Sequence, residues 1–166
     1  MTDTIVNLDT LPLEAFEKGT VFAAETASIG EPLGLRALGA RLHVVQPGKS
    51  ACPFHRHHGA DELFLILSGT GDYRIGERRL PVKAGDCLGA PSGGDAHQIF
   101  NTGSEPLRYI AFSNNSPGDV TEYPDSGRIS VNVGLTGFHR TDGTFKSGGK
   151  LTPLGYWDGE NIGDDK

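Results

Sequence analysis

The stretch GKSACPFHRHHGADELFLILSG, residues 48–69, indicates the fold more clearly than any other part of the chain. It contains a short strand-like segment around His55 and His57, a turn at residues 58–61, and an apolar strand that begins at Glu62. Side chains two residues apart on a strand point to the same face, so His55 and His57 are expected to project together. Two imidazoles and a carboxylate on adjacent strands are three ligands of a divalent metal site.

The rest of the chain predicts an all-β domain. A length of 166 residues suits one domain, while 24 glycines and 10 prolines disfavour long helices and favour short strands joined by turns. Short apolar segments alternate with turn residues over 35–113, which is typical of an antiparallel sandwich or barrel. We expect residues 35–113 to form the core and 1–34 an N-terminal arm, with at most one helical turn near residues 13–18. Residues 114–166 are expected to form a C-terminal extension that packs on the barrel or on a dimer partner.

Charge and hydropathy exclude several classes of partner. The formal net charge is −6, and no basic run is present, which argues against nucleic acid. No segment approaches the roughly 18 apolar residues of a membrane span, and a cytoplasmic protein that does not bind membranes is expected.

The two cysteines, Cys52 and Cys87, form no CxxC pattern and are expected to be reduced, although a redox role for Cys52 stays open.

A fourth candidate ligand, His97, lies in a second strand-like segment. Three imidazoles and one carboxylate suit Mn, Fe, Co, Ni, Cu or Zn, and the order of affinities does not choose among them. Side chains that share a strand face with Glu62 or His97 are expected to line a small-molecule pocket beside the metal. The predicted pocket residues are Phe64, Ile66, Tyr73, Ile99 and Tyr109.

The apolar run at residues 63–67 predicts an outer surface that needs a cover. If Glu62 faces the interior, the alternate side chains from Leu63 onward face outward, and the arm, the tail or a second subunit must shield them. We expect a homodimer. Tyr156 and Trp157 in the tail are expected to dock on the barrel or on the partner, with residues 147–150 more mobile.

These residues resemble the two motifs of the cupin superfamily. The first motif is matched by Gly48, His55, His57, Glu62 and Gly69, and the second by Gly85, Pro91, Gly93, His97 and Asn101. Each match has one additional residue in a loop. The resemblance covers about residues 35–113 and implies a double-stranded β-helix, or jelly-roll barrel. It also implies that His55, His57, Glu62 and His97 bind one divalent metal ion.

The resemblance extends more loosely to small bacterial cupins, some of which are proposed sugar-phosphate isomerases. We therefore expect a metalloenzyme that acts on a small polar organic molecule, with isomerisation of a sugar or sugar phosphate as the leading class. A metal-dependent dioxygenase and a non-catalytic ligand sensor are the alternatives. No independent general base is evident beside the motif, because Asp61 points away and Asp95 lies in a loop; this weakens the isomerase hypothesis.

Overall fold

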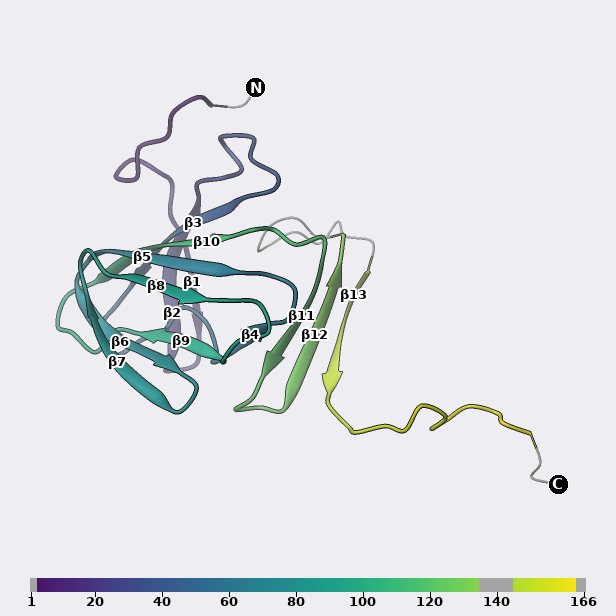
Figure 1. Cartoon of the computed structure of the whole chain (residues 1–166). Helices are drawn as coiled ribbons and strands as arrows, with labels where there is room; N and C mark the ends of the chain where they lie inside the picture. The colour runs from purple at the N-terminus through teal and green to yellow at the C-terminus, as the bar shows by residue number, and fades with distance from the viewer. Residues whose placement is uncertain (1–2, 135–144, 164–166) are drawn as a thin grey trace.

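The computed structural model describes residues 3–134 and 145–163. All of the regular secondary structure in these residues is β-strand (Figure 1). The strands are β1 (Glu14–Lys18), β2 (Phe22–Ser28), β3 (Gly39–Val45), β4 (Arg56–His57), β5 (Glu62–Ser68), β6 (Thr70–Ile75), β7 (Arg78–Lys83), β8 (Cys87–Ala90), β9 (His97–Phe100), β10 (Leu107–Ser113), β11 (Gly118–Tyr123), β12 (Arg128–Val133) and β13 (Phe145–Lys150). The prediction of an all-β protein is confirmed. The described part of the chain contains no helix with the length and apolar character of a membrane span.

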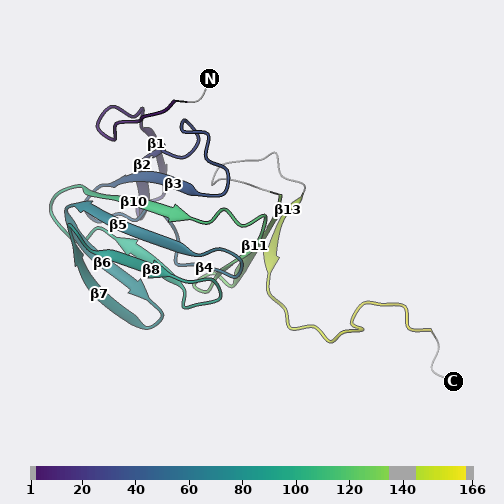
Figure 2. The ribbon, with the colours of Figure 1, turned by 45° about the horizontal axis from the view of Figure 1, so that its top comes forward.

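The strands form three antiparallel sheets. A six-stranded sheet has the order β1-β2-β3-β10-β5-β8, and a three-stranded sheet has the order β7-β6-β9. A four-stranded sheet, β13-β12-β11-β4, lies at one end of these two, as the turned view in Figure 2 also shows. Several neighbouring strands are distant in sequence; in the six-stranded sheet, for example, β10 lies between β3 and β5.

The core fills the space between the six-stranded and three-stranded sheets. On β5, Phe64 and Ile66 are 6% and 1% exposed, whereas the alternate residue Leu63 is 44% exposed. Tyr73 of β6 and Ile99 of β9 meet this face of β5 in one buried cluster. The strand alternation expected from the sequence is therefore confirmed, and the inward face of β5 leads directly to Glu62 at its start.

The N-terminal region is joined to the barrel more closely than an arm would be. The expected helical turn near residues 13–18 is wrong, because β1 pairs with β2 along its whole length and β2 pairs with β3. Residues 3–13 lie outside this sheet, and Asp9 accepts a hydrogen bond from Arg108 of β10 at 2.9 Å. The N-terminal segment therefore contacts β10 through this exposed ion pair.

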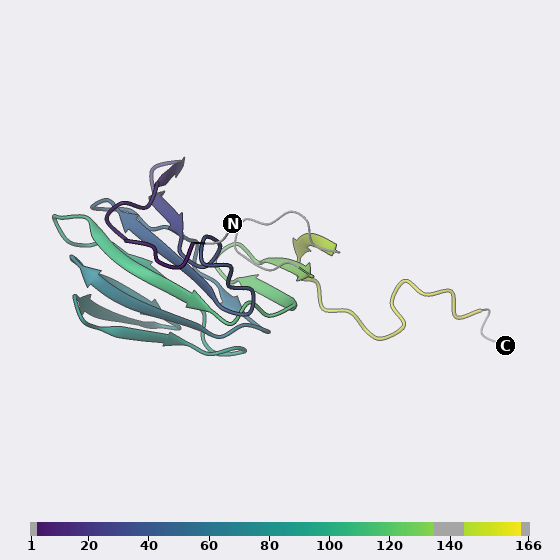
Figure 3. The same cartoon turned by 90° about the horizontal axis from the view of Figure 1, so that it is seen from above.

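The C-terminal region divides into a sheet and a tail. β11 pairs with β4 in the register Thr121↔His57, which brings this sheet to the strand that holds His57. Residues 147–150, expected to be mobile, are paired with β12 as part of β13. Residues 151–163 extend away from the barrel (Figure 3). Tyr156 and Trp157 are 87% and 63% exposed and contact each other, so the expected packing of the tail on its own barrel is not observed.

Candidate metal centre

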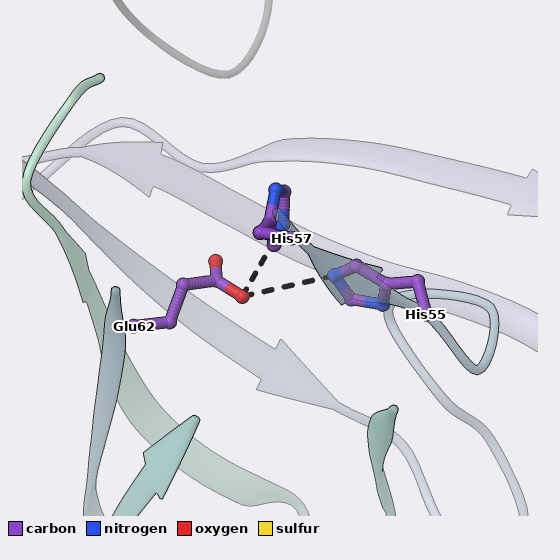
Figure 4. A group of neighbouring side chains, drawn as sticks. All are labelled: His55, His57 and Glu62. Atoms are coloured by element: carbon purple, nitrogen blue, oxygen red, sulfur yellow. Dashed lines mark ion pairs between the residues drawn. The ribbon is translucent and has the colours of Figure 1, made fainter. Parts of the chain in front are cut away.

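Three histidines and one carboxylate meet at the end of the barrel, and they come from all three sheets. His57 lies on β4 of the four-stranded sheet, Glu62 begins β5 of the six-stranded sheet, and His97 begins β9 of the three-stranded sheet. His55 precedes β4 and forms a β-bridge with His97. Figure 4 shows the rings of His55 and His57 directed toward the carboxylate of Glu62.

The three imidazole Nε2 atoms surround one oxygen, Oε2 of Glu62. The distances to this oxygen are 3.0 Å from His97, 3.4 Å from His57 and 3.7 Å from His55. One ligand atom from each of His55, His57 and Glu62 lies within 4.8 Å of the other two, and His97 joins this set through its contact with Glu62. The structure thus brings together all four residues that the sequence singles out.

The chemistry of this donor set fits a divalent transition metal. The site is largely shielded from solvent, with side-chain exposure from 3% for His97 to 18% for His57. The buried Nε2 of His57 has no hydrogen-bond partner among the described residues, although it faces the carboxylate. A buried nitrogen lone pair left without a donor is costly unless something binds it, and a metal ion would do so. Neutral imidazoles with one carboxylate are ligands for this class of metal.

Burial and neighbouring charges shift the pKa values within the site. Burial, with the nearby His97, lowers the pKa of His55 to about 4, so this ring is neutral at pH 7. Burial also acts to lower the pKa of His57, but the hydrogen bond to Asp119 and the charge of Glu62 outweigh it and raise the pKa. Burial acts to raise the pKa of Glu62, and the surrounding histidines, led by the hydrogen bond from His97, overcome it and lower the pKa.

Asp119 contacts the candidate ligand His57, although no motif in the sequence indicates this residue. It lies on β11, 62 residues after His57, and its Oδ2 is 2.5 Å from His57 Nδ1. Burial acts to raise the pKa of Asp119, yet this hydrogen bond and the charge of His57 outweigh it and lower the pKa to about 2. No local pattern marks the position, because the pairing of β11 with β4 alone brings it to the histidine.

A cavity of about 410 Å³ opens beside the four residues. Of the predicted pocket residues, Phe64, Ile99 and Tyr109 line this cavity. Ile66 and Tyr73 do not, and these two assignments need correction. Ile66 is buried deeper in the core, and the Tyr73 hydroxyl donates a hydrogen bond to the Gly89 carbonyl at 3.0 Å.

The cavity wall also contains polar side chains that were not among the predicted pocket residues. The ring of His43 on β3 stacks on Tyr109, with centroids 4.9 Å apart, and Arg41 on the same strand donates a hydrogen bond to Thr26 at 3.2 Å. Cys52 also lines the cavity, and burial together with the charge of Glu62 raises the pKa of its thiol to about 12. This thiol is therefore protonated at neutral pH, which argues against a redox role that needs a thiolate.

The far side of the cavity comes from the C-terminal sheet. Thr121 and Tyr123 of β11 and Ser130 and Asn132 of β12 line it, opposite the six-stranded sheet. This wall is mostly polar, whereas the barrel side combines the apolar Phe64 and Ile99 with the polar side chains of Arg41 and His43. A cavity with apolar surface and a few polar groups suits a small polar organic molecule.

Comparison with known proteins identifies the family. The model of the cupin domain matches residues 41–113. A proposed sugar phosphate isomerase from Acidithiobacillus ferrooxidans is 30% identical, and the match covers 68% of this chain and 72% of that one with a TM-score of 0.65. The chain belongs to the cupin superfamily. The double-stranded β-helix, or jelly-roll, fold expected from the motifs is thereby confirmed.

Two further similarities extend the comparison. A cupin-superfamily sugar phosphate isomerase from Silicibacter pomeroyi is 18% identical but covers 94% of both chains, with a TM-score of 0.75, so the fold is shared beyond the barrel. The oxalate-binding protein of Thermotoga maritima is 37% identical over 65 residues, which is 39% of this chain and 53% of the relative. This cupin spans about half the length of the curated relatives that it matches.

Proposed function

We propose that this cupin is a metal-dependent enzyme acting on a small polar organic molecule, with isomerisation of a sugar or sugar phosphate as the leading class. The observation that carries the proposal is the set of His55, His57, Glu62 and His97, which faces a cavity large enough for such a molecule. A divalent metal ion bound there would supply a Lewis acid for a carbonyl or hydroxyl oxygen. The similarity to a proposed sugar phosphate isomerase supports this class of reaction.

Aldose–ketose isomerisation needs a group that moves a proton between adjacent carbons. Glu62 and Asp119 are both engaged with the histidines, so neither is an independent base. His43 lines the cavity, lies outside the ligand set, and is held by its stacking on Tyr109. We assign His43 as the candidate for proton transfer, and the guanidinium of Arg41 on the same strand as the candidate partner of an anionic group on the substrate.

A second candidate function is binding or conversion of a small dicarboxylate. It is favoured by the 37% identity to a protein named for oxalate binding, and the cation of Arg41 in the cavity wall suits this ligand equally well. A metal-dependent dioxygenase is the remaining enzymatic alternative, and a ligand sensor the non-catalytic one.

The test begins with metal analysis of protein purified without an affinity tag, followed by a substrate panel. Sugar phosphates in deuterated water would show isomerisation as solvent deuterium incorporated next to the carbonyl, and the His43→Gln variant should lose this exchange while keeping its metal. Metal-loaded protein that exchanges no sugar phosphate but binds oxalate saturably would favour the second candidate. Oxygen consumption with an organic substrate would identify a dioxygenase.

We also propose that the protein is a cytoplasmic homodimer. Support for the dimer comes from apolar side chains that the described chain leaves exposed, including Leu63 on β5 and Trp157 in the tail. In the tail, the exposed Tyr156 and Trp157 contact each other, and apolar groups gathered in this way commonly mark an interface.

A further inference from the structure

Strand β11 reaches the metal centre from outside the residues that match the cupin domain. Oδ2 of Asp119 accepts hydrogen bonds from His57 Nδ1, at 2.5 Å, and from the Thr121 hydroxyl, at 3.1 Å. Oδ1 of the same carboxylate accepts a hydrogen bond from the backbone N–H of Gly59 at 2.8 Å. Both oxygens are therefore occupied, and the carboxylate is fixed from three directions.

We propose that Asp119 is a positioning residue for the metal centre, holding His57 with its proton on Nδ1 and its Nε2 free to bind metal. This inference rests on the metal site in the proposed function. A neutral imidazole carries a single N–H, and an ionised carboxylate can only accept a hydrogen bond. The proton must therefore lie on the nitrogen that faces Asp119, which leaves the lone pair on Nε2, the atom 3.4 Å from Glu62.

The backbone of β11 fixes the distance between these two side chains. Thr121 is the register partner of His57, and the N–H of His58 donates to the Val120 carbonyl at 2.9 Å. Because Asp119 lies two residues before Thr121, both side chains share one face of β11, directed at the histidine. The C-terminal sheet thus positions a ligand on β4 as well as covering the cavity.

His55 is also oriented by a hydrogen bond at Nδ1, but its partner is close to it in the sequence. Its Nδ1 lies 2.7 Å from the Pro53 carbonyl, two residues earlier, which likewise places the proton on Nδ1 and leaves Nε2 facing Glu62. His55 is thus oriented by its own segment, whereas His57 depends on a strand 62 residues away. Loss of the distant partner should therefore affect metal binding without changing the ligands themselves.

The experiment compares zinc affinity, measured by competition with a chelator, in the wild type and in Asp119→Asn. Asparagine has a single oxygen, which can take the place of Oδ1 or of Oδ2 but not of both. When this oxygen faces Gly59, the amide nitrogen faces His57 Nδ1, donates to it and favours the other tautomer. We expect zinc affinity to fall about 10–100-fold, the usual effect of losing a partner of a metal-ligating histidine. Asp119→Glu, which keeps two acceptor oxygens, should recover part of this loss.

Glu122→Gln is the matched control, because Glu122 lies on the same strand but bonds Arg56 and His58, and neither of these is a proposed ligand. Its zinc affinity should equal that of the wild type. If Asp119→Asn does not fold, long-range ¹H–¹⁵N spectra of the zinc-loaded wild type still test the tautomer, and they should show the His57 proton on Nδ1. A proton on Nε2, or wild-type affinity in a folded Asp119→Asn, would overturn the role of Asp119. A wild type that binds no zinc or other divalent metal would instead overturn the metal centre itself.

Discussion

At the scale of single residues, His97 is the candidate ligand whose removal tests the four-residue site most directly. Its Nε2 is the nearest of the three imidazole nitrogens to Glu62, at 3.0 Å, and its ring is almost fully buried. We expect His97→Ala to weaken metal binding by more than about 100-fold, because losing a ligand costs more than the roughly 10–100-fold effect of losing a ligand's hydrogen-bond partner.

Isothermal titration with zinc measures this change, and His58→Ala is the control. His58 follows the ligand His57 but turns outward to Glu122, at 3.2 Å. The His58→Ala variant should bind zinc with the affinity of the wild type. Unchanged affinity and stoichiometry in His97→Ala would reduce the site to three ligands.

The pH dependence of metal binding should be governed by His57. The pKa of His55 is lowered to about 4 by burial and His97, so this ring is already neutral across the neutral range. The pKa of His57 is raised by its hydrogen bond to Asp119 and the charge of Glu62, so as the pH falls a proton competes with the metal at His57 before it does so at His55. Metal affinity should therefore rise with pH until the His57 pKa is passed, and fall by about tenfold per pH unit below it. Affinity that stays constant between about pH 8 and pH 5 would contradict this assignment.

At the scale of elements, Asn101 links the end of β9 to the strands around it. Its side chain is fully buried, donates to the carbonyls of Val45 and Glu105 at 2.7 and 2.9 Å, and accepts from the Gly103 N–H at 2.9 Å. Asn101→Ala removes all three of these buried hydrogen bonds. We expect a loss of about 2–4 kcal/mol in the free energy of unfolding, measured by urea denaturation.

The exposed Asn114 provides the comparison for this variant. Asn114→Ala should change the free energy of unfolding by less than about 0.5 kcal/mol. Equal stability of the two variants would show that the turn after β9 does not depend on the buried amide.

The elements that the sequence predicted well are those with local patterns. The alternation along β5 indicates which residues face inward, and the turn between β4 and β5 follows from its small and polar residues. β1 was missed because EAFEK has residues that favour a helix, while the pairing with β2 that makes it a strand is a tertiary effect. Asp119 was missed for a similar reason, since no spacing rule connects β11 to β4. The ligand residues themselves come from a compact motif, and metal binding by them stays a prediction.

At the scale of the whole molecule, the exposed tail bears on assembly. Leu154, Tyr156 and Trp157 are more than 60% exposed in the single chain, where water would surround them. We predict that the tail packs against a second copy. Light scattering should then give twice the chain mass of 17.6 kDa, and deletion of residues 151–166 should shift the particle toward the single-chain mass. A full-length particle of 17.6 kDa at micromolar concentration would rule out the dimer.

Because each sheet contributes a candidate ligand to the site, a bound ion would act as a cross-link between sheets that few backbone hydrogen bonds, such as those of the His55–His97 bridge, otherwise join. Ligand binding to the native state alone stabilises it by about 2.7 kcal/mol when the free metal is at 100 times its Kd. The melting temperature should therefore rise on adding zinc and fall back to its metal-free value when a chelator removes the zinc. Amide hydrogen exchange in β4, β5 and β9 should then slow to a similar degree on adding zinc, because the ion would hold the three strands together.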